Sequence, residues 1–301
     1  MRSRWALVVS SFVVALALPA QQVGHDRAFW RAKLDASATP PSAGELPGLL
    51  RELTTLLGDP DPELRDDLAF SLLVQWLYRD RLVEVADRRR LLAEWQASLR
   101  GGIDRPGDDR VLRRSFTALA LSLLAALDVD EPWLADAEFD ALFAAAIAYL
   151  ADERDVRGFE PQRGWLHSVA HTADLLKFLA RNPRLDGPQQ RALWTAVADK
   201  LQRTDVPLVH GEDERLARAL LALLGRADLD LAMARAGIAA LWPAPADAAP
   251  SLVALAQQHN QRHVVLSLHA LLATGATDAP TGEPAAACRS LLAQMLRERR
   301  R

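Results

Sequence analysis

Apolar residues recur at intervals of three and four along most of the chain, and this spacing constrains the fold more than any other feature. In the segment 45–57, ELPGLLRELTTLL, leucine stands at positions 46, 49, 50, 53, 56 and 57. This spacing places the apolar side chains on one face of an α-helix. The segment 114–127, RSFTALALSLLAAL, is apolar nearly all round after Phe116 and is expected to be a central helix. Alternating strand patterns and Asn-Gly hairpin turns are missing from the sequence, so an all-α fold is predicted.

Helix-breaking segments interrupt this pattern every 15 to 25 residues, and each contains Gly or Pro together with Asp, Asn or Glu. They are GDPDP at 58–62, GGIDRPGDD at 101–109, DVDEP at 128–132, RGFEPQRG at 157–164, NPRLDGP at 182–188, VPLVHGED at 206–213, WPAPADAAP at 242–250 and GATDAPTGEP at 275–284. About a dozen helices joined by short loops pack as antiparallel pairs. We therefore expect a HEAT-like α-solenoid or a partial α/α toroid, with helix pairs that repeat at about 40 residues and form a concave surface.

The 301 residues are enough for one large or two modest domains. No linker is long enough to force a domain boundary, so a single domain is predicted over residues 45–300; the proline- and alanine-rich stretch 242–250 is the best candidate for a subdivision. Half of the residues are apolar and a quarter are charged, which allows a large core. The formal net charge of −3 argues against a nucleic-acid-binding protein, which usually has a basic excess. Cys288 is the only cysteine, so a disulfide within the chain and a two-cysteine zinc site are excluded.

The first 20 residues have the order of a secretory signal peptide. Arg2 and Arg4 precede an apolar run of about 14 residues, which is shorter than the roughly 20 residues that span a bilayer. Small residues follow, and cleavage is expected after Ala20 or, as an alternative, after Ala17. We predict an exported protein, periplasmic or secreted, that has no stable membrane span after cleavage. Residues 21–44 are interpreted as an N-terminal extension.

A polar stripe is predicted in the segment 163–180, RGWLHSVAHTADLLKFLA, which is expected to be helical. At about 100° per residue, His167, His171 and Asp174 lie within roughly 60° of one another on one face. The opposite face is apolar and carries Val169, Ala173 and Leu176. We expect the stripe to line the concave surface of the helical array.

Two histidines four residues apart on a helix can bind one metal ion, with zinc as the most common choice. Asp174 could be a third ligand or could orient His171. Position 168 is Ser, so the glutamate that serves as general base in HExxH helices is missing. The same spacing also fits a polar cluster that joins two helices and binds nothing.

Charged residues before and after this segment are further candidates for a ligand site. Glu153, Asp155 and Arg157 precede Gly158, where a tight turn would fold the loop over the start of the next helix. The segment 210–224 opens a helix with three acidic residues, which also fit the helix dipole, and then Arg215. Charges that pair with one another on a solvated loop are the alternative. His259 and His263, a second pair at this spacing, are interpreted as exposed residues near the start of a helix.

Four stretches of the sequence together resemble the bacterial domain-of-unknown-function 2785 family. They are DPELRDDLA at 61–69, RSFTALALSLL at 114–124, ERDVRGFEPQRGWLHSVAHTADLL at 153–176 and HGEDERLARAL at 210–220. The third is the most specific; Leu166 and Thr172 stand where the family usually has Ala and often has Gly. The resemblance covers about 45–300 and implies an all-α fold without an assigned activity. Its pattern picks out Arg114, Asp155, Arg157, Gly158, Trp165, His167, His171, Asp174, Glu212 and Arg215.

Two functions remain open from the sequence. The first is a binding or interaction scaffold. Its polar stripe recognises a polar or anionic ligand or a protein partner, with Glu153, Arg157 and Arg215 around the stripe and Trp165 as a wall of the pocket. The second is a hydrolase in which His167 and His171 bind a divalent metal such as zinc, or act as a general acid–base pair oriented by Asp174. Arg114 is a weaker candidate for the same ligand site.

Overall fold

The computed structural model describes residues 24–35, 39–242, 251–276, 279 and 281–298. In this part of the chain, α-helices dominate and the only sheet is a two-stranded hairpin. The helices are α1 (Arg27–Leu34), α2 (Leu46–Leu56), α3 (Ser71–Leu73), α4 (Val85–Ser98), α5 (Arg110–Asp130), α6 (Asp136–Asp152), α7 (Ser168–Arg181), α8 (Gly187–Arg203), α9 (Glu212–Leu224), α10 (Leu231–Ala240), α11 (Leu252–Thr274) and α12 (Gly282–Glu298). The strands are β1 (Phe159–Glu160) and β2 (Gly164–Trp165). The all-α fold predicted from the apolar spacing is confirmed.

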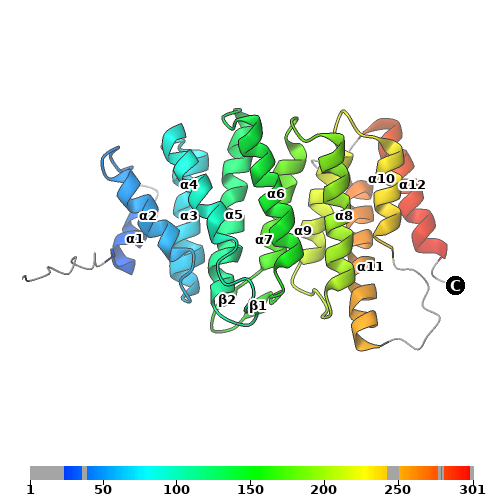
Figure 1. The fold of residues 1–301 in the computed structure, drawn as a ribbon, viewed down its shortest axis with the longest axis horizontal. Helices are drawn as coiled ribbons and strands as arrows, with labels where there is room; N and C mark the ends of the chain where they lie inside the picture. The colour runs from blue at the N-terminus through cyan, green and yellow to red at the C-terminus, as the bar shows by residue number, and fades with distance from the viewer. Residues whose placement is uncertain (1–23, 36–38, 243–250, 277–278, 280, 299–301) are drawn as a thin grey trace, which may run out of the picture.

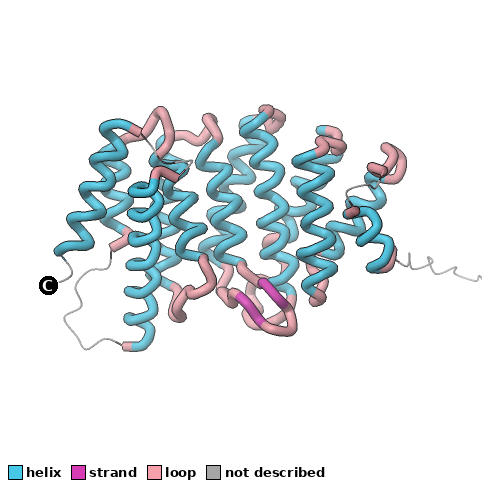
Figure 2. Tube along the Cα trace, turned by 180° about the vertical axis from the view of Figure 1, so that it is seen from behind, coloured by secondary structure: helices cyan, strands magenta, loops and turns pink. Residues whose placement is uncertain are grey.

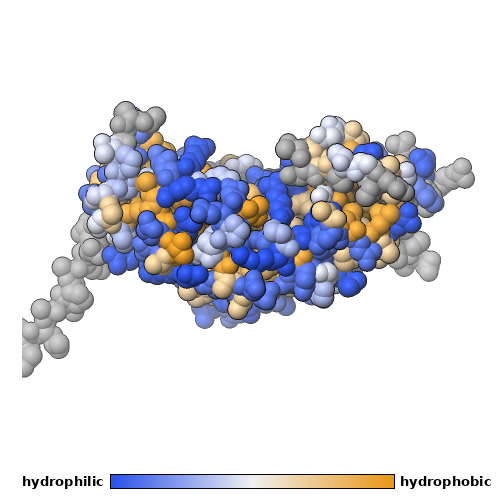
Figure 3. Space-filling model, turned by 90° about the horizontal axis from the view of Figure 1, so that it is seen from above, coloured by the Kyte–Doolittle hydropathy of each residue, from blue (hydrophilic) through white to orange (hydrophobic). Residues whose placement is uncertain are grey.

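The helices form an elongated, two-layered array that follows the order of the sequence (Figure 1). Helices α5, α7, α9 and α11 pack against one another in that order, and α6, α8, α10 and α12 do the same. Alternating helices therefore occupy opposite layers, as in solenoids built from antiparallel helix pairs. The β-hairpin projects from the lower edge of this array (Figure 2). Seen from above, the array is indented along one long side and rounded along the other (Figure 3).

Polar side chains cap the starts of several helices. Asp186 precedes α8, and its carboxylate accepts a hydrogen bond from the backbone N–H of Gln189 at 2.8 Å. Asp230 caps α10 in the same way, and Ser251 caps α11. These side chains satisfy N–H groups that have no partner within the helix.

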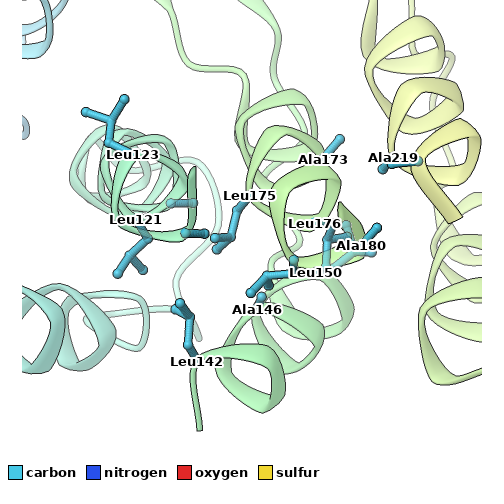
Figure 4. Packing of buried hydrophobic residues seen from close by; sticks show 14 of the residues in the cluster. Leu121, Leu123, Leu142, Ala146, Leu150, Ala173, Leu175, Leu176, Ala180 and Ala219 are labelled. Atoms are coloured by element: carbon cyan, nitrogen blue, oxygen red, sulfur yellow. The ribbon is translucent and has the colours of Figure 1, made fainter. Parts of the chain in front are cut away.

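One hydrophobic core runs through the described residues, from Trp30 on α1 to Leu292 on α12. Helix α5 is buried almost all round, which confirms the central helix expected at 114–127. Figure 4 shows Leu121 of α5 on the side of Leu142 of α6 and Leu175 of α7, with Ala219 of α9 beyond. Helix α1 lies within the stretch 21–44, and its Trp30 is buried in this same core.

The stretch 63–79 is helical throughout, but most of it is wound as π-helix, at Glu63–Phe70 and Val74–Arg79 on either side of α3. π-Helical turns are rare and are frequently found at functional sites. The first of them carries Arg65, which reaches the hairpin described below.

The predicted signal peptide, residues 1–20, lies outside the described residues. None of the described helices is both long enough and apolar enough to cross a bilayer.

Candidate functional site

The chain between α6 and α7 doubles back on itself before the second of these helices begins. Phe159 pairs with Trp165 and Glu160 with Gly164, and the backbone pairing extends outward to Arg157 and His167. Gly164 has a φ of 68°, a left-handed conformation that is costly for residues with a Cβ atom. The hairpin therefore brings the charged loop over the start of α7, as the positions of the glycines predict.

Arg65 holds the hairpin against the helical array. Its guanidinium donates hydrogen bonds to the backbone oxygens of Arg163 and Trp165, the second at 3.1 Å, and to that of Asp59 at 2.7 Å. Arg65 is fully buried and lies over the ring of Phe116 at 4.8 Å. One side chain of the π-helical turn thus donates hydrogen bonds to three backbone oxygens in two loops.

Helix α7 begins at Ser168, five residues later than the start predicted at 163. His167 lies just before the helix in a left-handed conformation, with φ 51° and ψ 35°. The cause is the hairpin, because residues 163–167 are extended or turning while they pair with the loop. The three polar residues are therefore not a stripe on one helix, and His171 and Asp174 are buried rather than lining an open concave surface.

His167 and His171 still lie next to each other, with ring centroids 5.7 Å apart and planes at 82°. Trp165 stacks on His167 with centroids 4.3 Å apart and is 38% exposed, so its indole covers the His167 imidazole on one side. Edge-to-face contact with Phe116 covers His171 from the side of α5.

Hydrogen bonds fix the proton on each neutral imidazole. His167 Nε2 lies 3.0 Å from the backbone oxygen of His210, which can only accept, so Nε2 carries the proton. The Ser115 hydroxyl donates its proton to the backbone oxygen of Leu166, so it accepts from His171 Nδ1 at 2.8 Å. The unprotonated nitrogens are therefore His167 Nδ1 and His171 Nε2.

Both imidazoles are neutral at pH 7. Burial lowers the pKa of His171 well below its usual range, and the charge of Arg215, together with the charge that His167 takes up when it is protonated, lowers it further. Burial also lowers the pKa of His167, although the nearby carboxylate of Glu212 opposes the change. Neutral imidazoles are the form that binds metals or accepts protons.

The Asp174 carboxylate contacts basic side chains, whereas the sequence predicted that it would bind a metal ion or orient His171. Its carboxylate forms an ion pair with Arg215 of α9 and a second with Lys177 at 3.4 Å. In the described part of the chain, no hydrogen bond joins it to either imidazole. Across the same residues, no three His, Cys, Asp or Glu side chains lie close enough to hold one metal ion.

Asp155 and Arg157 form a pair at the base of the hairpin. The Arg157 guanidinium donates to both carboxylate oxygens, with Nη2 to Oδ2 at 2.7 Å, and to Glu160 at 2.9 Å. Burial alone would raise the pKa of Asp155. The hydrogen bonds and charge of Arg157, together with the hydrogen bond from the N–H of Gly107, outweigh burial, so the pKa of Asp155 is lowered. Hydrogen bonding to Asp155 in turn raises the pKa of Arg157. The pair is therefore ionised across the physiological range.

A groove of about 450 Å³, here called the loop groove, opens beside this pair. It is lined by Pro106, Gly107, Arg154, Asp155, Val156, Arg157, Gly158, Asp205, Val206, Pro207, His210 and Glu212. The groove thus combines three of the predicted candidates, Asp155, Arg157 and Glu212, with an apolar wall. Arg215 lies outside this lining, on the Asp174 side of the imidazoles.

Glu153 and Arg114 form a separate buried cluster. Arg114 Nε donates to Glu153 Oε2 at 2.5 Å, and both side chains are almost fully buried. Arg114 also donates to the backbone oxygens of Gly101 and Gly102. This cluster ties the 101–109 loop to the end of α6 and lies apart from the imidazoles.

The family model described as "Protein of unknown function (DUF2785)" matches residues 99–269, more than half of the chain. The chain belongs to this family. The match covers the three family stretches quoted from residue 114 onward, whereas DPELRDDLA lies before it. Searches of curated proteins and of solved structures gave no match.

The sequence did not single out two residues that hold the site of this DUF2785 protein together. Ser115 sets the tautomer of His171, and it directly follows Arg114 in the quoted family stretch. Arg65 anchors the hairpin from the stretch 61–69, which resembles the family but contains none of the residues that the family pattern picks out. The second histidine pair lies on α11, where His259 is partly exposed, His263 is exposed and the two rings stack with centroids 4.0 Å apart.

Gly158 of this DUF2785 protein leaves no room for a side chain. A Cβ atom at Gly158 would lie 2.2 Å from Nδ1 of His210, so the imidazole would have to move. We expect Gly158→Ala to lower the free energy of unfolding by about 1–3 kcal/mol through overpacking, as measured by urea denaturation. Gly187→Ala is the matched control, because nothing lies within 4 Å of that Cβ position. Equal unfolding curves for the two variants would show that the His210 imidazole moves aside without any loss of stability.

Proposed function

We propose that this DUF2785 protein is an exported binding protein whose loop groove recognises a small polar or anionic ligand. The observation that carries the proposal is Arg157, whose guanidinium is fixed in place and still 31% exposed in the groove. A side chain held by Asp155 and Glu160 before the ligand arrives loses little conformational entropy on binding. Such a planar, fixed donor suits carboxylate or phosphate groups.

The rest of the loop groove supports a ligand with more than one polar group. Arg154 supplies positive charge, while the exposed Asp205 can accept hydrogen bonds from hydroxyl or amino groups. Arg157, whose charge Asp155 and Glu160 balance, supplies N–H donors. Val206 and Pro207 form an apolar side. Hydroxy acids, sugar acids and sugar phosphates carry this combination of groups.

Calorimetric titration with a library of hydroxy acids, sugar acids and sugar phosphates would test the proposal. We expect at least one compound to bind, and Arg157→Gln to weaken it about tenfold or more, because a charge-assisted hydrogen bond contributes about 1.5–3 kcal/mol. Arg163→Gln is the matched control: Arg163 lies on the same loop, pairs with the exposed Asp109 and does not line the groove. A library without a binder that Arg157→Gln weakens would reject the proposal.

A metal-dependent or acid–base hydrolase is the second candidate function. Its support is that the unprotonated nitrogens of two neutral imidazoles remain available while the ring centroids lie 5.7 Å apart. Two imidazoles that share one zinc ion, each at about 2.1 Å from it, have ring centroids at a comparable separation. Stoichiometric zinc in the purified protein, lost in a folded His171→Ala variant, would favour the hydrolase over the binding protein.

A further inference from the structure

A second cavity, here called the α6–α8 cavity, lies where the ends of α6 and α8 meet the loops at the hairpin edge. Its volume is about 600 Å³, and it is lined by Pro106, Ala151, Asp152, Glu153, Arg154, Val156, Asp199, Lys200, Arg203, Thr204 and Asp205. This cavity shares Pro106, Arg154, Val156 and Asp205 with the loop groove. It contains Lys200, which neither the imidazoles nor the loop groove uses.

Lys200 is a buried amine without an ion pair in the described part of the chain. The residue is 6% exposed, and its Nζ donates one hydrogen bond, to the backbone oxygen of Glu153 at 2.5 Å. The carboxylate of Glu153 is already bonded to Arg114 and to the N–H of Asp155. Among the described residues, the other two donors of the Lys200 ammonium have no partner. Charged lysines are almost never fully buried unless they are paired, so this position favours the neutral amine.

Burial lowers the pKa of Lys200 to about 8, and the charge of Glu153 only partly opposes the change. At pH 8 about half of the side chain is then the free amine, whereas an ordinary lysine is less than about 1% deprotonated. Desolvated lysines of this kind are the ones that react with carbonyl groups.

We propose that Lys200 is a nucleophile that forms an imine with small carbonyl compounds carrying a carboxylate, such as α-keto or α-aldehydo acids, inside the α6–α8 cavity. The Nζ lone pair attacks the carbonyl carbon and forms the C–N bond. The carbonyl oxygen takes up two protons, one from the amine and one from solvent, and leaves as water. The product is a protonated imine, and no group is oxidised or reduced.

The cavity supplies a partner for the carboxylate of such a compound. Arg154 is exposed and has no ion pair or hydrogen bond to another side chain in the described part of the molecule. Arg203, the other arginine of the cavity, forms only an exposed pair with Asp199 at 3.5 Å. Arg154 is therefore the cation that we assign to the carboxylate.

Trapping of the imine tests the proposal on the full-length protein. The protein is incubated with glyoxylate between pH 6 and 9, reduced with cyanoborohydride, digested and mapped by mass spectrometry. The chain contains only Lys33, Lys177 and Lys200, so each preparation carries its own reference lysines. At pH 8 we expect the initial rate at Lys200 to exceed that at Lys177 by about tenfold or more. Equal modification of the three lysines, or none at Lys200, would overturn the proposal.

Two variants separate this site from the loop groove. Arg154→Gln should slow the reaction of Lys200 with glyoxylate severalfold and leave its reaction with acetaldehyde, which has no carboxylate, unchanged. If Arg154→Gln slows neither reaction, the preference for carboxylates is wrong. Arg157→Gln should leave the modification of Lys200 unchanged even if it abolishes binding in the loop groove. Because mapping is done on the unsubstituted protein, the result does not depend on whether a Lys200 variant folds.

Discussion

Replacing Arg114 by methionine is expected to lower the free energy of unfolding by about 3–5 kcal/mol, because the substitution leaves the carboxylate of Glu153 buried without its cation. The two side chains are 1% and 3% exposed, and Nε lies 2.5 Å from Oε2. Among the described residues, this carboxylate also accepts a hydrogen bond from the backbone N–H of Asp155 at 2.9 Å. Arg114 also supplies the hydrogen bonds that hold Gly101 and Gly102, so the 101–109 loop loses its anchor too. Urea denaturation followed by circular dichroism measures the change.

A matched surface pair separates this effect from a general loss of positive charge. Arg100 pairs with Asp152, the neighbour of Glu153 in sequence, but the two side chains are 57% and 47% exposed. We expect Arg100→Met to cost about 0–1 kcal/mol. The double variant Arg114→Met, Glu153→Gln should regain much of the stability lost in Arg114→Met, since it no longer buries an unpaired charge. Similar losses of unfolding free energy for Arg114→Met and Arg100→Met would contradict the prediction that breaking the buried Arg114–Glu153 pair is costly.

The features that could be predicted from the sequence are those set by local spacing. The apolar run after Phe116 places α5 at the centre of the array, because a helix with no polar face has to be covered on all sides. Each predicted break within the described residues overlaps with a loop, although the loops at 80–84 and 225–230 fall in none of the breaks. Gly158 and Gly164 mark the turn that folds the charged loop back. Asp155 and Arg157 could be recognised as site candidates because they are charged residues directly before Gly158, in a loop that folds back over the start of the next helix.

The features that could not be predicted depend on contacts between distant segments. Helical spacing continues through His167, yet pairing with Arg157 and the anchoring of residues 163 and 165 by Arg65 hold this part of the chain out of the helix. Asp174 shares a helix with His171, but Arg215 of α9 determines where its carboxylate points. Helical spacing places Lys200 on the apolar face of α8 with Leu193 and Val197. The contact of its Nζ with the backbone oxygen of Glu153, however, depends on where the ends of α6 and α8 meet, which the local spacing does not show.

Acidification is expected to destabilise the protein between pH 7 and pH 5, chiefly through His171. The folded-state pKa of this imidazole is well below 6.5, because burial, the charge of Arg215 and the charge that His167 takes up on protonation all oppose its protonation. Between the folded pKa and an unfolded pKa of about 6.5, the unfolded chain binds more protons than the folded chain. The stability is therefore complete above pH 6.5 and is lost progressively as the pH falls toward the folded pKa. Within that window the loss approaches about 1.4 kcal/mol for each pH unit.

His171→Gln should reduce this pH dependence, because the glutamine side chain stays neutral throughout. The amide can still donate to Ser115, so the hydroxyl can keep its bond to the backbone oxygen of Leu166. The variant should be less stable than the parent protein at pH 7, where packing against Phe116 is lost, and the two stabilities should converge toward pH 5. A weaker slope should remain, because burial also lowers the pKa of His167. His269→Gln, on α11, serves as the control and should keep the full slope. If His171→Gln loses as much stability between pH 7 and pH 5 as the parent protein, His171 is not the group whose protonation destabilises the folded protein.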